Sequence, residues 1–245
     1  MQFYDSNGNV IKPKLPNVVL MGDSITDNVD DYGWWVDIIP EYVEFQSLKN
    51  YACGFARWTL ASGTTENLTT HKHEAASWNV IWNQVNRLKA DVDSGATAIP
   101  DVILILAGTN DVSLNQNFGT IETAFDGESI LDKSFADIAT MAQSIRYTCE
   151  YIRSLYPYAQ VILATPMQRP GQSESSTAWQ CRDIIIGCAR NLSLCVIDQM
   201  AELGVYGFGE STDPVYLGDW VHPNRTTGSR LIARFIAKQL AQKVI

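Results

Sequence analysis

Ser24, Asp219 and His222 are the residues of this chain whose types and spacing best fit nucleophilic catalysis. A serine hydroxyl is hardly ionised at neutral pH, so it needs a general base, and a carboxylate must fix the tautomer of that base. Asp219 and His222 stand three positions apart, so a single turn could supply both groups. The residue types therefore predict a catalytic triad of Ser24, His222 and Asp219.

Short apolar runs with β-branched residues predict the elements that must position this triad. Such runs are typical of strands buried on both faces of a parallel sheet, and they occupy residues 17–21, 101–107, 160–164 and 194–197. Residues 43–48 alternate less regularly and form a weaker strand candidate. Helical spacing lies between the strands, at residues 34–42, 78–93, 135–155, 178–191 and 226–243. The alternation predicts an α/β fold, a three-layer α/β/α sandwich around a parallel five-stranded sheet.

The predicted sheet belongs to a single domain at residues 17–245. Residues 1–16 contain a turn signal and two prolines, which predicts an N-terminal hairpin or a tail. Three long polar connections interrupt the domain, at residues 55–77, 112–134 and 199–218. Connections of this length in compact domains are usually functional or mobile.

Polar residues able to do chemistry follow directly after the predicted strands. Gly22-Asp23-Ser24 follows the first strand, Gly54 the second and Gly108-Thr109-Asn110-Asp111 the third. Ligands of open parallel sheets bind beyond the carboxyl ends of the strands, so these segments should meet at one rim. Asp219-Trp220-Val221-His222 precedes the last helix and reaches the same rim if that helix packs back on the sheet.

These segments resemble the sequence blocks of the SGNH hydrolases, the GDSL-type esterases and lipases. Gly22-Asp23-Ser24 is similar to the first block, Gly108-Thr109-Asn110-Asp111 to the third and Asp219-Trp220-Val221-His222 to the last, in family order. The resemblance implies a flavodoxin-like α/β/α fold and a triad of Ser24, His222 and Asp219. It also implies an oxyanion hole made of the Ser24 amide, an amide of the second block and the Asn110 side chain.

The second block departs from the family pattern. The family usually has a glycine five residues after an asparagine, whereas Asn50-Tyr51-Ala52-Cys53-Gly54-Phe55 has glycine at four and phenylalanine at five. Gly54 is the first choice for the second oxyanion donor, and Phe55 is the alternative. A backbone amide does the work in either case.

Each residue also has a simpler interpretation. Ser24 could be the N-cap of a helix, and Asn110 and Asp111 could be turn formers, a role that we expect for Asp111 but not for Asn110. His222 could be a surface histidine. The ordered set of motifs favours catalysis for Ser24, Asn110 and His222.

Substrate and metal sites are less sharply indicated. Trp58 and Trp220 adjoin motif segments and are candidates to contact the substrate, whereas Trp78 and Trp82, at helical spacing, fit the core better. His71-Lys72-His73-Glu74 lacks further ligands at recognisable spacing, so no metal and no cofactor are expected.

Composition limits the partners. The formal net charge is -9 with scattered Lys and Arg, which opposes binding to nucleic acid or anionic membranes. No apolar run approaches the roughly 18 residues of a membrane span, so a soluble protein is expected. The first residues lack the pattern of a signal peptide, although the mature form of an extracytoplasmic protein would look the same, so the compartment stays open. The oligomeric state is not indicated.

The five cysteines are expected to be unpaired thiols in the core.

The sequence thus predicts a serine esterase that works through an acyl-enzyme, with a short acyl group, such as acetyl, on a carbohydrate as its substrate. Lipase, lysophospholipase or thioesterase activity is the alternative within the family. A catalytically inactive member of the fold that binds glycans is the alternative from another class.

Overall fold

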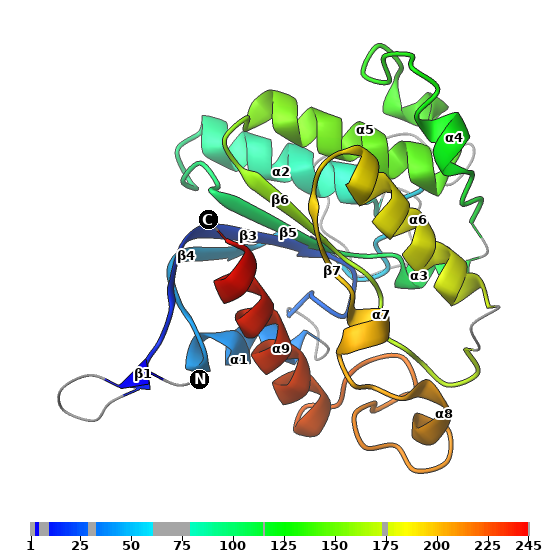
Figure 1. The fold of residues 1–245 in the computed structure, drawn as a ribbon. Helices are drawn as coiled ribbons and strands as arrows, with labels where there is room; N and C mark the ends of the chain where they lie inside the picture. Colours follow the sequence, from blue (N-terminus) through cyan, green and yellow to red (C-terminus); the bar gives the residue numbers. More distant parts are fainter. Residues whose placement is uncertain are drawn as a thin grey trace.

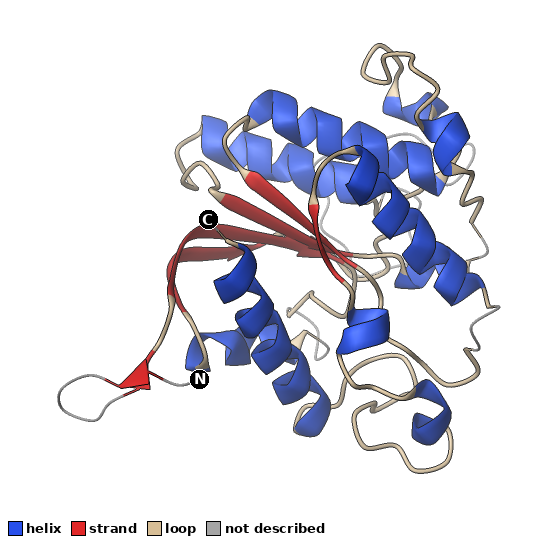
Figure 2. Ribbon diagram, in the orientation of Figure 1, coloured by secondary structure: helices blue, strands red, loops and turns tan. Residues whose placement is uncertain are grey.

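Five parallel strands form the central sheet of the computed structural model, which describes residues 3–4, 10–28, 33–60, 79–114, 116–172 and 176–244. The spatial order is β4-β3-β5-β6-β7, and every neighbouring pair is parallel. The strands are β3 (Lys14–Gly22), β4 (Glu44–Asn50), β5 (Val102–Leu106), β6 (Gln160–Ala164) and β7 (Cys195–Ile197). Helices cover both faces of the sheet (Figures 1 and 2). The predicted three-layer α/β/α fold is confirmed.

Alternate residues of the strands build two separate cores. On β3 and β5, Val19 and Ile103 pack into one cluster, and Val18 and Leu104 into the other. This follows from the period of two, which sends successive side chains to opposite faces. The first cluster is covered by α2 (Ile81–Asp93), α5 (Met141–Leu155) and α6 (Thr177–Asn191), and the second by α1 (Trp34–Ile38) and α9 (Thr227–Lys243).

The first sheet strand begins earlier than the apolar run indicates. β3 starts at Lys14 and contains Pro16, which has no N–H to donate. Over Lys14 to Asn17 the strand pairs only with β4, because pairing with β5 starts at Val18. The proline therefore lies where one side of the strand is unpaired. Before it, β1 (Phe3–Tyr4) and β2 (Val10–Ile11) pair antiparallel and project from the body of the molecule (Figure 1).

Two predicted helices are shorter than their apolar patterns. Residues 135–155 form a 3₁₀ turn, η2 (Phe135–Asp137), and then α5, because the Thr140 side chain accepts from the Gln143 amide and caps a new helix. Residues 34–42 form α1 followed by a 3₁₀ turn, η1 (Ile39–Glu41), where Pro40 interrupts the α-helical hydrogen bonds.

The long connections contain short helices. These are α4 (Ile121–Ala124) in the second connection, and α7 (Gln199–Glu202) and α8 (Gly207–Glu210) in the third. A further short helix, α3 (Thr109–Ser113), follows β5. Most of the first connection lies outside the described residues, as does Trp78, and α2 begins at Ile81.

Two further expectations concern the cysteines and membrane spans. All five cysteines are free thiols, four of them buried and Cys195 half-buried, as predicted. Within the described ranges, no helix is both long and apolar enough to cross a bilayer.

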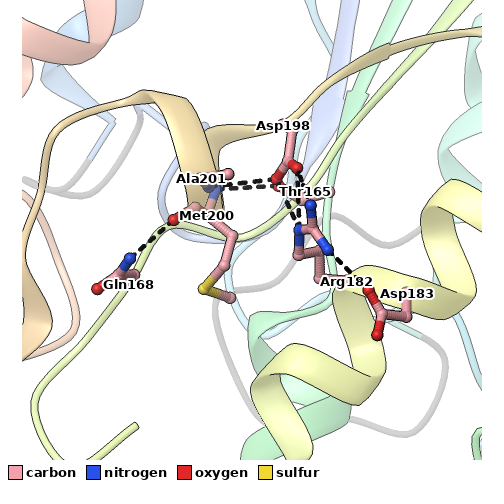
Figure 3. A network of polar contacts seen from close by, with 7 residues as sticks. All are labelled: Thr165, Gln168, Arg182, Asp183, Asp198, Met200 and Ala201. Carbon is pink, nitrogen blue, oxygen red and sulfur yellow. Dashed lines mark hydrogen bonds and ion pairs between the residues drawn. The ribbon is translucent and has the colours of Figure 1, made fainter. Parts of the chain in front are cut away.

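A polar network ties together the carboxyl ends of β6 and β7 (Figure 3). Asp198, which follows β7, accepts from Arg182 Nε at 2.9 Å and from Thr165 Oγ1 at 3.1 Å. Asp198 also caps α7 by accepting from the Ala201 amide. The side chains of Arg182 and Asp198 are 23% and 13% exposed, so the pair is largely withdrawn from water. The network therefore holds the third long connection against the sheet.

Asp198→Ala should lower the free energy of unfolding by about 2–3 kcal/mol, because it leaves Arg182 partly buried without its main partner. Asp183→Ala is the matched control, since Asp183 touches the same arginine from an exposed position. It should cost less than about 0.5 kcal/mol. Urea unfolding measures both values, and equal losses would contradict a structural role for the Asp198 network.

Candidate active site

The turn after β3 presents Ser24 at the rim of the sheet. The carbonyl of Asp23 accepts from the amides of Thr26 and Asp27, and its carboxylate accepts from the Ile25 amide. A side chain at Gly22 would place a Cβ 2.3 Å from the carbonyl oxygen of Leu106 on β5, so only glycine fits there. The close approach of β3 and β5 thus fixes where the turn begins.

The structure brings Ser24, His222 and Asp219 together. Ser24 Oγ lies 2.7 Å from His222 Nε2, and His222 Nδ1 lies 2.7 Å from Asp219 Oδ2. The side chain of His222 is 18% exposed and that of Asp219 is 50% exposed. The three groups form one hydrogen-bonded chain between segments that are 198 positions apart in sequence.

Asp219 is held as a carboxylate. Burial favours the neutral acid, but hydrogen bonds from the amide and ring of His222 and from the Val221 amide outweigh it and lower the pKa of Asp219. Its Oδ1 accepts from both amides, at 2.7 and 3.0 Å. An ionised Asp219 places the proton of a neutral His222 on Nδ1 and leaves Nε2 as the acceptor for the Ser24 hydroxyl.

Glu210, at the end of α8, positions the loop that carries Asp219 and His222. Glu210 is 3% exposed, and its carboxylate accepts from the amides of Val215, Tyr216 and Leu217. Three charge-assisted bonds to consecutive amides fix the chain just before the loop that contains Asp219 and His222. No local sequence motif marks Glu210, so its role is visible only in the structure.

Asn224 fixes the other end of the same loop. Its Nδ2 donates to the Val215 carbonyl at 2.8 Å, and its Oδ1 accepts from the amides of Thr227 and Gly228 at the start of α9. An asparagine before a predicted helix is a capping signal, so its role could have been found from the sequence.

The Gly54 and Phe55 amides of the second block differ in their hydrogen bonding. The Gly54 amide donates to the buried carboxylate of Asp27 at 2.7 Å. Phe55 takes the left-handed conformation, with φ of 63°, and the residue is 46% exposed. Among the described residues, no group accepts from the Phe55 amide or from the Ser24 amide. The sequence favours Gly54 over Phe55 as the second oxyanion donor, whereas the hydrogen bonding favours Phe55, because the Gly54 amide already has an acceptor.

The third block follows β5 and enters α3. Gly108 has φ of 125°, and a Cβ there would lie 2.8 Å from Cys181 Sγ. Asn110 is half-buried and donates through Nδ2 to the carbonyl of Ala56 at 2.9 Å. The side chain amide of Asn110 thus lies against the turn that contains Phe55.

Asp111 is structural, in agreement with the expectation. It is fully buried and accepts from the amides of Trp58 and Thr59 and from the Thr59 hydroxyl. Burial raises the pKa of Asp111, although these hydrogen bonds oppose the shift. The residue fastens the second block to the third.

The prediction that Trp58 contacts the substrate is wrong. Trp58 is 1% exposed and packs in the same core cluster as α2, where the bond from its amide to Asp111 holds it. Trp220 is 63% exposed and stands between Asp219 and His222. Trp82 stacks on Phe135 with ring centroids 4.8 Å apart, as expected for a core residue.

The candidate metal cluster, His71-Lys72-His73-Glu74, lies outside the described residues. Within the part of the chain that the structure describes, no three His, Cys, Asp or Glu side chains gather as a metal site.

The fold and the hydrogen-bonded chain from Ser24 to Asp219 define an α/β/α protein with a serine-centred site at the carboxyl edge of its sheet. Residues 20–227 match the GDSL-like Lipase/Acylhydrolase family, and the chain belongs to that family. The class of chemistry implied by this membership is ester hydrolysis.

Solved structures share the fold. A Lactobacillus plantarum protein matches 96% of this chain and 100% of its own, with a TM-score of 0.64 and 17% identity. A lipase/acylhydrolase from Enterococcus faecalis matches 95% and 97%, with a TM-score of 0.55 and 18% identity. An acetyl xylan esterase matches 94% and 100%, with a TM-score of 0.56 and 16% identity. No curated protein sequence matches the chain.

Asp23, directly before Ser24, is fully buried, and its burial raises the pKa to about 7. Because the unfolded chain has the ordinary value of 3.8, the folded state binds the extra proton between about pH 4 and pH 7. The Asp23 carboxyl therefore destabilises the fold progressively as the pH rises through this window. The penalty is complete above the folded pKa.

Asp23→Asn removes this ionisation and keeps an oxygen that can accept from the Ile25 amide. The midpoint of thermal unfolding of the variant, relative to wild type, should rise between pH 4 and pH 8. A rise of roughly 10 °C is expected, since a pKa change from 3.8 to about 7 corresponds to about 4 kcal/mol and each 1 kcal/mol moves the midpoint by roughly 2–4 °C for a chain of this size. A constant difference between variant and wild type across this range would contradict the raised pKa.

Proposed function

We propose that this chain is a serine esterase that hydrolyses carboxylic esters through an acyl-enzyme. The observation that carries the proposal is the chain of two 2.7 Å contacts from Ser24 through His222 to Asp219. A nucleophile, a base within hydrogen-bond reach and a carboxylate that orients the base are the components that this chemistry requires.

In the proposed mechanism, His222 Nε2 takes the proton of Ser24 as Oγ attacks the ester carbonyl. The tetrahedral intermediate collapses when the protonated His222 gives its proton to the leaving alcohol, and an acyl-serine remains. His222 then takes a proton from water, which attacks the acyl group. Collapse of the second intermediate releases the carboxylic acid and returns the proton to Ser24.

The proposed oxyanion hole consists of the Ser24 amide, the Phe55 amide and Asn110 Nδ2. Phe55 replaces Gly54 because the Gly54 amide already donates to Asp27. One hydrogen of Asn110 Nδ2 is taken by the Ala56 carbonyl, which leaves the other for the developing charge. Donors placed in this way act where charge develops, so they favour the transition state over the bound ester.

The proposed substrate is a short acyl ester, such as an acetyl group on a carbohydrate. Trp220 and Phe55 support it, because both are exposed aromatic side chains directly beside catalytic groups, where a flat sugar ring can stack. The structural similarity to an acetyl xylan esterase is consistent with this substrate. Lipase, lysophospholipase or thioesterase activity and glycan binding without catalysis are the competing proposals.

An acyl-ester panel tests the proposal. Purified protein is assayed on p-nitrophenyl acetate and decanoate, a thioester and acetylated xylan fragments. Wild type should release acetate, and Ser24→Ala should lower kcat by about 10³-fold or more, because no other group supplies the nucleophile. Ser154→Ala, on the exposed face of α5, is the matched control and should behave as wild type.

Equal rates for wild type and Ser24→Ala would replace the esterase with a binding protein. A strong preference for decanoate, with no release of acetate from xylan fragments, would overturn the substrate and leave the mechanism intact.

A further inference from the structure

Gly54 is held on both sides by buried side chains that have no part in the relay from Ser24 to Asp219. Its amide donates to Asp27 Oδ2 at 2.7 Å, and its carbonyl accepts from Asn79 Nδ2 at 3.0 Å. Asp27 and Asn79 are only 2% and 3% exposed. Polar groups so deeply buried are costly unless they are hydrogen-bonded, so these bonds fix the Gly54 backbone firmly.

The bond from Asn79 also orients the next amide. The carbonyl of Gly54 and the N–H of Phe55 belong to one planar peptide unit, in which the two groups point in opposite directions. Because the carbonyl faces Asn79, the N–H of Phe55 faces away from it. Phe55 has φ of 63°, a conformation that a bulky residue keeps only when its surroundings impose it.

The turn around Phe55 is tied to the candidate site from two directions. The Cys53 amide donates to the Gly22 carbonyl at 3.1 Å, at the start of the nucleophile turn. The Ala56 carbonyl accepts from Asn110 Nδ2 at 2.9 Å. These two bonds hold the turn that carries the Phe55 amide close to both the nucleophile turn and Asn110.

We propose that Asn79 and Asp27 are positioning residues of the oxyanion hole, which hold the Gly54–Phe55 peptide so that the Phe55 amide points at the developing charge. The inference rests on the proposed esterase mechanism. A misplaced amide weakens the transition state but not the bound ester, so the effect falls on kcat and spares KM.

Asn79→Ala removes the bond to Gly54 and is compared with Asn83→Ala. Asn83 is a matched control because it is equally buried, at 1% exposed, and lies four residues after Asn79, at the start of α2. It is not one of the two side chains, Asp27 and Asn79, that bond the Gly54 backbone. Asn79→Ala should lower kcat by about 10-fold to 100-fold and leave KM within about two-fold. Asn83→Ala should show a similar loss of thermal stability with an unchanged kcat. Asn110→Ala sets the scale, with an expected loss of about 10²-fold.

The affinity of a boronic acid separates positioning from a general loss of structure. The boronate bonds to the serine oxygen and presents a tetrahedral oxygen to the oxyanion hole, so it mimics the transition state. Asn79→Ala should weaken boronate inhibition by the same factor as it lowers kcat/KM. Unchanged boronate affinity, or a kcat as high as that of Asn83→Ala, would overturn the inference.

Asp27→Asn is the second variant in case Asn79→Ala does not fold. It keeps an oxygen acceptor for the Gly54 amide but loses the charge, so kcat should fall by several-fold to about 10-fold at constant KM. Wild-type kcat in Asp27→Asn would also overturn the inference. If Ser24→Ala is inactive while these variants keep wild-type kcat, only the positioning role fails. If Ser24→Ala is active, the esterase mechanism itself fails.

Discussion

The position of β3 between β4 and β5 is the constraint on which the rest of the site depends. Parallel strands end at the same edge of a sheet, so the loops after three neighbouring strands must meet. These loops carry Ser24, Phe55 and Asn110. The fourth segment, with His222, comes from the far end of the chain and is held there by Glu210 and by the helix α9 that follows it.

Two bulky residues beside the proposed catalytic groups have a left-handed backbone. Phe55 has φ of 63° and Trp220 has φ of 69°, and both side chains are exposed. Glycine would adopt these conformations at a lower cost, so backbone geometry alone does not explain the two rings. Strain of this kind is kept near functional sites when the surrounding bonds impose it. Next to Phe55, those bonds are the ones that Gly54 makes with Asp27 and Asn79.

Features that depend on residues close together in the chain could be predicted from the sequence. The buried strands show as apolar runs, and the short spacing of Asp219 and His222 predicts a base and its orienting carboxylate. Contacts between residues far apart in the chain could not be predicted from the sequence. The choice between the Gly54 and Phe55 amides depends on the bond from the Gly54 amide to Asp27, 27 positions away, which leaves no sequence signal. The position of Trp58 depends in the same way on the bond from its amide to Asp111, 53 positions away.

The most direct test of the account is a crystal structure of the protein after reaction with a p-nitrophenyl phosphonate, which transfers its phosphonyl group to an activated serine. The account predicts an adduct on Ser24 Oγ. Its phosphonyl oxygen should lie about 2.7–3.1 Å from the Phe55 amide, the Ser24 amide and Asn110 Nδ2, with the Gly54 amide still bonded to Asp27. An adduct whose oxygen accepts from the Gly54 amide, or the absence of any adduct on Ser24, would contradict it.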